Sequence, residues 1–125
     1  MRLFATQPSS AIQAIAEQAR SAAGIVCVAN VDMVTRAATD SRLAAVMRRA
    51  FLVVTDGMPL VWVLRARGQA AAQRIYGPDL MRQLCVAAAR DRLPVYLYGG
   101  SPSELAALQD ELRRTIPALQ VAGAG

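Results

Sequence analysis

Hydrophobic residues follow two alternating patterns along this chain. Segments with apolar residues three or four positions apart are typical of helices with one buried face. Short continuous apolar runs are typical of strands that are buried on both sides. The helical segments begin near residues 9, 39, 59, 78 and 101, and the runs span residues 25–29, 51–55, 94–98 and 118–122. The pattern therefore predicts helices that alternate with strands.

Local signals mark several ends of these segments. Ser9 or Ser10 is a suitable cap for the first helix, and Thr39 or Asp40 for the second. The segment Ser101-Pro102-Ser103-Glu104 has the form of a capping box with proline at the first helical position. These residues predict where the helices start.

The order of the elements indicates the fold class. Apolar strands that alternate with helices predict an α/β fold, with a Rossmann-like parallel sheet flanked by helices. The 125 residues, 54% of them hydrophobic, suit a single domain over residues 1–125. The chain stops at Gly123-Ala124-Gly125, where a glycine pair after a strand normally leads into a further helix. We therefore expect the sequence to be truncated at its C-terminus.

The composition excludes several kinds of chemistry. The chain has no histidine, which removes Ser-His-Asp, Cys-His and two-histidine zinc sites. Cys27 and Cys85 lie within apolar segments and are expected in the core. We therefore expect no metal site and no cofactor. Residues 1–10 resemble no secretory signal and no apolar run is long enough to span a bilayer, so we expect a cytoplasmic protein.

The positive charge comes entirely from arginine, with 14 basic and 9 acidic residues and a net charge of +5. Arginine suits phosphate through its planar fork of donors, although a general compositional bias would also account for its frequency. The chain has no basic run and few aromatic residues, so we expect no nucleic-acid partner. Anionic lipid headgroups or a nucleotide diphosphate fit better.

The apolar segment Leu60 to Leu64 is followed by Arg65 and Arg67. It suits a membrane surface, a second subunit in a homo-oligomer, or burial in the core. We expect burial in the core.

Polar residues and glycines follow the predicted strands. They are Asn30 and Asp32, Asp56 and Gly57, Gly99, Gly100 and Ser101, and finally Gly123 to Gly125. Ligands of open parallel sheets bind at the carboxyl ends of the strands, so we expect one shared binding edge. The other interpretation is that these are ordinary turn residues.

Asp56 is the strongest candidate for catalysis. It follows a buried strand and precedes Gly57, which would let a substrate approach closely, as a general base requires. The structural alternative is that Asp56 caps the next helix. The segment also resembles the Asp-x-Asp-Gly motif of dehalogenase-type phosphatases, but Val54 replaces the nucleophile.

Two further segments suit a diphosphate. Gly99-Gly100-Ser101 leads into a helix start, where free N–H groups favour an anion. Arg74 has the fork of donors that binds phosphate, with a solvated side chain as the alternative. The glycines match neither the full dinucleotide-binding pattern nor a Walker loop.

Several of these segments together resemble the WecG/TagA/CpsF glycosyltransferases, family 26. The matching segments are Ala29-Asn30, Thr55-Asp56-Gly57, the R-x-x-G-x-D-L pattern of Arg74 to Leu80, and Leu97 to Gly100. The resemblance implies an inverting transfer of N-acetylmannosamine or a related hexose from a UDP-sugar to a polyprenyl-diphosphate-linked sugar. It places this reaction in bacterial cell-surface polysaccharide biosynthesis, at the inner face of the cytoplasmic membrane.

The resemblance also implies roles for individual residues. Asp56 corresponds to the proposed catalytic base, and Arg74 to the arginine that steadies the diphosphate. Asn30, Gly77 and Asp79 match further motif positions around the same cleft. The family commonly has threonine at the position of Val28.

Other readings of the sequence stay open. A second half with a Gly-x-Pro-x-Gln-Glu-type motif is typical of the family and is absent from these residues. The alternative function is therefore a non-catalytic nucleotide- or partner-binding α/β module left by truncation. A dinucleotide-dependent oxidoreductase is disfavoured, because no glycine follows the first predicted strand at Ala29 to Asp32.

Overall fold

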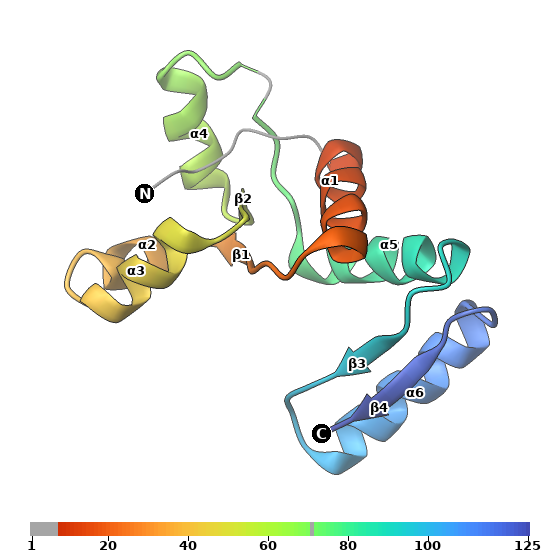
Figure 1. Cartoon of the computed structure of the whole chain (residues 1–125). Coiled ribbons are helices and arrows are strands. Elements are labelled where there is room, and N and C mark those ends of the chain that lie inside the picture. The colour runs from red at the N-terminus through yellow and green to blue at the C-terminus, as the bar shows by residue number, and fades with distance from the viewer. Residues whose placement is uncertain (1–7, 71) are drawn as a thin grey trace. The chain divides into compact units, whose positions relative to one another are not determined.

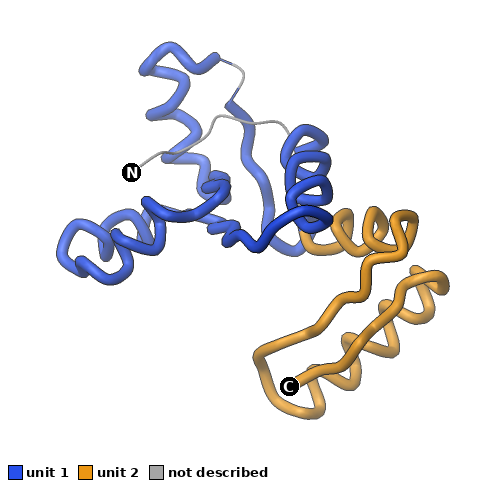
Figure 2. The backbone as a smooth tube through the Cα atoms, viewed as in Figure 1, with its two compact units in different colours: residues 1–80 blue, residues 81–125 orange. Residues whose placement is uncertain are grey.

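The structure is a computed structural model that describes residues 8–70 and 72–125 (Figure 1). The chain folds into two compact units, residues 1–80 and residues 81–125, which are coloured separately in Figure 2. Each unit is described by itself. Residues 1–7, which belong to the segment expected to carry no secretory signal, lie outside the described part.

The first unit has two parallel strands and several helices. Its elements are α1 (Pro8–Ser21), β1 (Val26–Ala29), α2 (Val31–Ala37), α3 (Ser41–Arg49), β2 (Leu52–Thr55), α4 (Met58–Ala66) and the start of α5 (Gly77–Arg90). Strands β1 and β2 pair in parallel, with Val26 opposite Leu52 and Ala29 opposite Thr55. All four residues of β2 are buried, as the continuous apolar run predicts.

Both helices between the two strands, α2 and α3, start at a residue whose side chain caps the helix. The carboxylate of Asp40 accepts hydrogen bonds from the N–H groups of Arg42 and Leu43, which confirms Asp40 as the cap of α3. Helix α2 was not predicted from the hydrophobic pattern. It is only seven residues long, too short for a clear hydrophobic pattern. The residue that marks its start is Asn30, whose side-chain oxygen accepts a hydrogen bond from the N–H of Met33 at 2.9 Å.

The start of α1 differs from the prediction. The helix begins at Pro8, so Ser9 and Ser10 lie in its first turn and neither precedes it as a cap. Proline favours the first helical position because its ring already holds the required backbone angle.

An extended segment after α4 adds to the hydrogen bonding of β2. The N–H of Ile75 donates to the carbonyl of Thr55 at 2.7 Å, and the hydroxyl of Thr55 donates to the carbonyl of Gln73 at 3.3 Å. Ala72 and Ile75 are buried. Residues 72–75 are therefore fixed against the end of β2, and this contact places Arg74 next to residue 56.

The core of the first unit is formed between its strands and helices. Cys27, Ala29, Ala37, Met47, Val53 and Leu60 form one buried cluster. Burial raises the pKa of the Cys27 thiol, because the charged thiolate loses its hydration. Cys27 is therefore a core residue, as predicted.

Helix α4 buries only one of its faces. Leu60, Val61 and Leu64 are buried, whereas Trp62 is 60% exposed and Val63 is 49% exposed. The expectation that the whole apolar segment is buried is therefore wrong for Trp62 and Val63. A helix turns by about 100° per residue, so five consecutive residues cannot all face one core.

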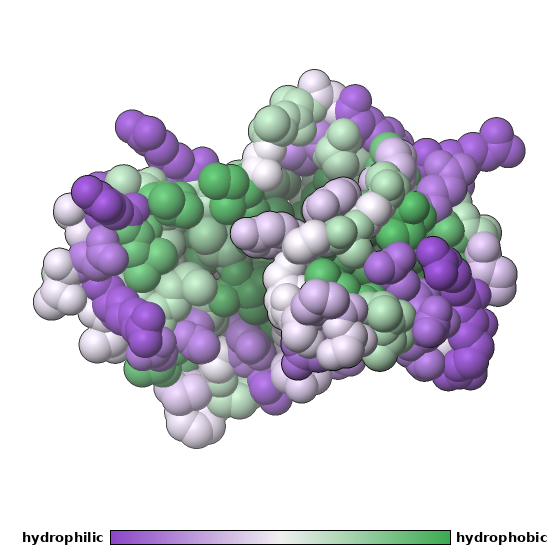
Figure 3. Space-filling view, turned by 90° about the horizontal axis from the view of Figure 1, so that it is seen from below, coloured by the Kyte–Doolittle hydropathy of each residue, from purple (hydrophilic) through white to green (hydrophobic). Residues whose placement is uncertain are grey.

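Hydrophobic residues are visible at the surface of the molecule among hydrophilic ones (Figure 3).

The second unit contains the remainder of α5, β3 (Val95–Leu97), α6 (Pro102–Thr115) and β4 (Val121–Ala124). Strands β3 and β4 pair in parallel, with an irregularity between Val95 and Tyr96. The core is formed by Cys85, Ala88, Leu97, Leu105, Leu112, Ile116 and Leu119. Strand β4 starts at Val121, later than the predicted residue 118, because residues 117–118 form a turn that the N–H of Leu119 closes by donating to the carbonyl of Ile116.

The capping box at the start of α6 is confirmed. The hydroxyl of Ser101 accepts from the N–H of Glu104 at 3.2 Å, and the carboxylate of Glu104 accepts from the N–H of Ser101 at 2.7 Å. The Ser101 N–H holds the pKa of Glu104 below its ordinary value. Local sequence thus determines this helix start.

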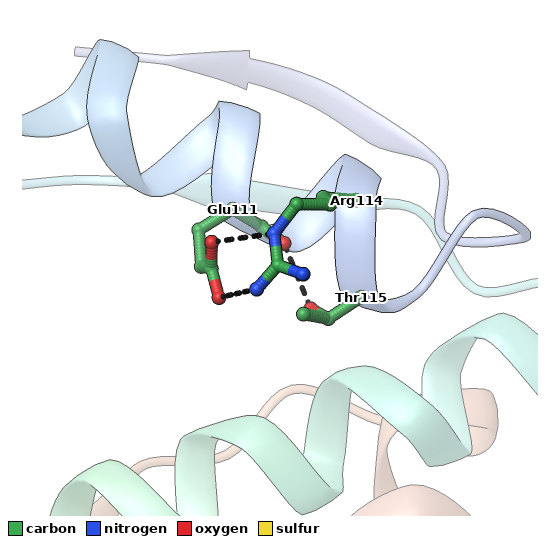
Figure 4. Close-up of polar contacts among 3 residues, drawn as sticks. All are labelled: Glu111, Arg114 and Thr115. Carbon is green, nitrogen blue, oxygen red and sulfur yellow. Dashed lines mark hydrogen bonds and ion pairs between the residues drawn. The ribbon is translucent and has the colours of Figure 1, made fainter.

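Exposed ion pairs lie along α6. The guanidinium of Arg114 donates to both carboxylate oxygens of Glu111, and the hydroxyl of Thr115 donates to the carbonyl of Glu111 (Figure 4). Both charged side chains are mostly exposed, so the pair contributes little to stability.

The predicted fold class is confirmed: the protein is α/β, with short parallel strands and flanking helices. Within the described residues the strands form two separate two-stranded sheets. The assignment of residues 1–125 to one domain stays a prediction. In the part of the chain that the structure describes, no helix has both the length and the apolar character needed to cross a membrane.

Candidate functional site

Asp56 lies directly after β2, at the carboxyl end of the strand. Its backbone N–H donates to the carbonyl of Ala29 at 2.8 Å, so the end of β2 is tied to the end of β1. The cap residue of α4 is Gly57, and no side chain caps this helix. The alternative interpretation, in which Asp56 caps the following helix, is therefore wrong.

Arg74 contacts Asp56 through a single nitrogen. Its Nε atom donates to the backbone carbonyl of Asp56 at 2.6 Å and lies 3.4 Å from the Oδ1 atom of the same residue. A guanidinium Nε carries one hydrogen, and the shorter contact uses it. The cation thus faces the carboxylate without forming a hydrogen bond to it.

The Oδ1 atom of Asp56 is buried and has no hydrogen-bond partner among the described residues. The side chain as a whole is 27% exposed, so part of it is open to solvent. A buried polar atom without a partner costs roughly 1–3 kcal/mol. In native structures such an atom calls for an explanation, such as a catalytic role or an ordered water or ion. The exposed part of the side chain lets a hydroxyl group that enters the site approach the carboxylate, which can accept a hydrogen bond and then a proton from it.

Asn30 and Gly57 are neighbours at the same edge. The Oδ1 atom of Asn30 is used by the cap of α2, which leaves its amide NH₂ as the group for a ligand. A Cβ atom added to Gly57 would meet nothing closer than the Cα atom of Asn30, at 3.8 Å. The φ angle of Gly57 is −88°, which any residue adopts. Neither packing nor backbone geometry therefore requires glycine at position 57.

Gly77 and Asp79 lie at the start of α5. A Cβ atom on Gly77 would be 3.7 Å from Cγ1 of Val28, an ordinary contact that places this helix start beside β1. Asp79 is in the first turn, where a carboxylate interacts favourably with the helix dipole. This local interaction is a structural reason for an acidic residue at position 79.

Gly99, Gly100 and Ser101 belong to the second unit. Gly99 and Gly100 have φ angles of +108° and +79°, a region that favours glycine. The carboxylate of Glu104 already binds the N–H of Ser101. A diphosphate at these backbone amides would meet this carboxylate as a like charge.

Sequence reasoning assigned no role to Tyr76 and placed Asp32 at a strand end. The Cζ atom of Arg74 lies 5.0 Å from the centre of the Tyr76 ring, within range of a cation–π contact. The sequence feature that could have indicated this contact is the aromatic residue two positions after the arginine. Asp32 instead forms an exposed ion pair with Arg36 on α2, at 3.1 Å.

The described residues contain no group of three or more side chains of the types that ligate metals, close enough together to hold an ion.

The first unit brings together Asn30, Asp56, Gly57 and Arg74. Their arrangement suits proton abstraction next to a bound anion.

Comparisons with known proteins agree with the sequence resemblance. Residues 1–125 match the model of the glycosyl transferase WecG/TagA/CpsF family. The chain is also similar to a Bacillus spizizenii protein named N-acetylglucosaminyldiphosphoundecaprenol N-acetyl-beta-D-mannosaminyltransferase, with 28% identity over 98 residues. The matched part is 78% of this chain, and it spans 38% of the length of that relative.

Proposed function

Because this chain belongs to the WecG/TagA/CpsF family of glycosyltransferases, we propose that it acts in an inverting glycosyl transfer in bacterial cell-surface polysaccharide biosynthesis. The donor is a UDP-sugar that carries N-acetylmannosamine or a related hexose. The acceptor is a sugar linked to a polyprenyl diphosphate. The name of the Bacillus relative, which specifies an N-acetylmannosaminyl group and a lipid-diphosphate acceptor, supports this choice of transferred sugar and acceptor.

The observation that carries the proposal is the partly exposed carboxylate of Asp56 beside Arg74, whose Oδ1 atom has no hydrogen-bond partner within the described residues. In the proposed reaction the Asp56 carboxylate removes the proton from the acceptor hydroxyl, which approaches the exposed part of the side chain. The hydroxyl oxygen attacks the anomeric carbon from the side opposite the nucleotide, and the bond between that carbon and the diphosphate breaks. The bonding electrons leave with UDP, so the configuration of the sugar is inverted.

Arg74 is proposed to hold a diphosphate in this reaction. Within the described chain only its Nε atom forms a hydrogen bond, and the side chain is 49% exposed. The terminal nitrogens are therefore able to donate to phosphate oxygens. Positive charge at this place stabilises negative charge that develops as the nucleotide leaves.

The other predicted residues are proposed as substrate contacts. Asn30 contributes its amide NH₂, and Gly57 and Gly77 leave room for a ligand at the strand ends. Asp79, in the first turn of α5, is proposed as a further substrate contact. Gly99, Gly100 and Ser101 are proposed as diphosphate contacts, which requires that the Glu104 carboxylate moves away.

We further propose a peripheral position on the inner face of the cytoplasmic membrane. The exposed Trp62 and Val63 on α4 support this location, since tryptophan favours the membrane interface. Arg65 and Arg67 follow in sequence and suit anionic headgroups, although the Nε atom of Arg65 also donates to the carbonyl of Ala72.

The experiment is to incubate this chain, and separately any longer product of the same reading frame, with UDP-sugars and a short-chain polyprenyl-diphosphate sugar. Release of UDP that depends on the acceptor and is lost in Asp56→Asn supports the proposal. Binding of UDP without release by either protein would favour the non-catalytic binding module. Transfer at a normal rate by Asp56→Asn would remove Asp56 from the role of base.

A further inference from the structure

The guanidinium of Arg74 is restrained at two points. Its Nε atom is hydrogen-bonded to the carbonyl of Asp56 at 2.6 Å, and its Cζ atom lies 5.0 Å from the centre of the Tyr76 ring. Ile75, between these two residues, is buried and is hydrogen-bonded to Thr55. The backbone that carries both side chains is therefore fixed against β2.

Tyr76 is not part of the buried core. Tyr76 is 46% exposed, and no hydrogen bond of its hydroxyl group occurs within the described residues. A ring face next to a guanidinium attracts the cation and limits the conformations of a long, flexible side chain. The contact therefore bears on the position of Arg74 more than on the stability of the core.

The restraint leaves the reactive part of Arg74 available. Of the five N–H donors of a guanidinium, the Nε donor is used by Asp56. Neither terminal nitrogen has a hydrogen-bond partner in the described chain, and these atoms present the planar pair of donors that binds two phosphate oxygens. An arginine held in this way loses less conformational freedom when it binds an anion.

We propose that Tyr76 is a positioning residue that holds the Arg74 guanidinium ready for a diphosphate group. The inference rests on the proposed function, in which Arg74 contacts the diphosphate. The aromatic ring performs the task and the hydroxyl is not needed, so phenylalanine is expected to replace tyrosine without loss.

The test compares Tyr76→Leu, which removes the ring, with Tyr76→Phe as the matched control. The first measurement is the NMR signal of the Arg74 Nε–H group, identified by its absence in Arg74→Lys. We expect an ordered signal in the wild type and in Tyr76→Phe, and increased motion in Tyr76→Leu. This measurement needs no ligand and no activity.

The second measurement is the affinity for UDP, by calorimetric titration. A cation–π contact at an exposed site corresponds to a loss of about two- to fivefold in Tyr76→Leu, with Tyr76→Phe unchanged. Circular dichroism checks that each variant is folded. An affinity change that is equal in both variants would overturn the role of the ring.

The two measurements separate the two proposals. If the Arg74 signal has the same order in Tyr76→Leu as in the wild type, Tyr76 does not position Arg74, whatever the transfer activity is. If the signal responds as expected but the wild-type protein neither binds UDP nor transfers sugar, the diphosphate role fails together with the proposed function.

Discussion

Arg74 and Asp56 are joined by a hydrogen bond from Nε to the backbone carbonyl, while the carboxylate oxygen Oδ1 lies 3.4 Å from the same nitrogen. The arrangement keeps a positive charge beside the carboxylate and leaves its buried oxygen without a hydrogen bond from any residue that the structure describes. A simple structural ion pair would instead use the Nε–H for the carboxylate. The geometry is therefore more useful for binding and proton transfer than for stability.

Replacement of Asp56 by asparagine is expected to lower glycosyl transfer by about 10²- to 10⁴-fold, because an amide cannot accept the proton of the acceptor. The overall shape of the side chain is retained, so UDP binding and the thermal unfolding midpoint should change little. Initial rates of UDP release measure the effect. Asp110→Asn is the matched control, since Asp110 is exposed on α6 and pairs only loosely with Arg113. An equal loss in both variants would contradict the assignment.

Gly57→Ala is expected to fold normally and to lose activity. The added Cβ would meet no atom within 3.8 Å, so the cost in unfolding free energy should not exceed about 1 kcal/mol, the usual cost of alanine at a helix cap. Loss of transfer with retained stability would indicate that the open space serves the substrate.

Gly24→Ala provides the contrast. A Cβ on Gly24 would lie 3.1 Å from the Cβ of Phe51, a tighter contact that requires Phe51 to give by a few tenths of an ångström. We expect the urea midpoint to be lower for this variant than for Gly57→Ala. A larger stability loss at position 57 would show that its role is structural.

Glu104→Gln is expected to lower stability in a pH-dependent way. The Ser101 N–H depresses the pKa of Glu104 from its ordinary value of 4.5. The contribution of the carboxylate is therefore fully present above pH 4.5 and is lost as the pH falls through the depressed pKa. Urea unfolding of both proteins from neutral to acidic pH measures the difference. The difference should vanish at low pH, where protonated Glu104 resembles glutamine, and a constant difference would contradict this explanation.

Trp62 is the single tryptophan of the chain, so its fluorescence reports directly on α4. Vesicles that contain anionic phospholipids should shift the emission to shorter wavelength, and salt should weaken the effect because the headgroups attract arginine electrostatically. Trp62→Ala should reduce vesicle binding measured by sedimentation. Val46→Ala, at an exposed apolar residue on α3, should not. Unchanged emission would argue against a membrane contact at α4.

The elements of this protein could be predicted from the sequence where the signals are local. The capping box of Ser101 and Glu104, the cap at Asp40 and the apolar run of β2 each depend on residues within a few positions of one another. The parallel arrangement follows from such runs alternating with helices. The candidate base at Asp56 could be selected on the same grounds, from its place after a buried strand.

Tertiary structure decided the properties that depend on distant residues. Arg74 and Asp56 are 18 positions apart, so the hydrogen bond that orients the guanidinium exists only after residues 72–75 pack beside β2. The exposure of Trp62 and the use of the Asn30 oxygen as a cap likewise depend on which helix face meets a core and where the next helix starts. A sequence pattern specifies residue types and spacing, whereas a site requires atoms to be brought together in space.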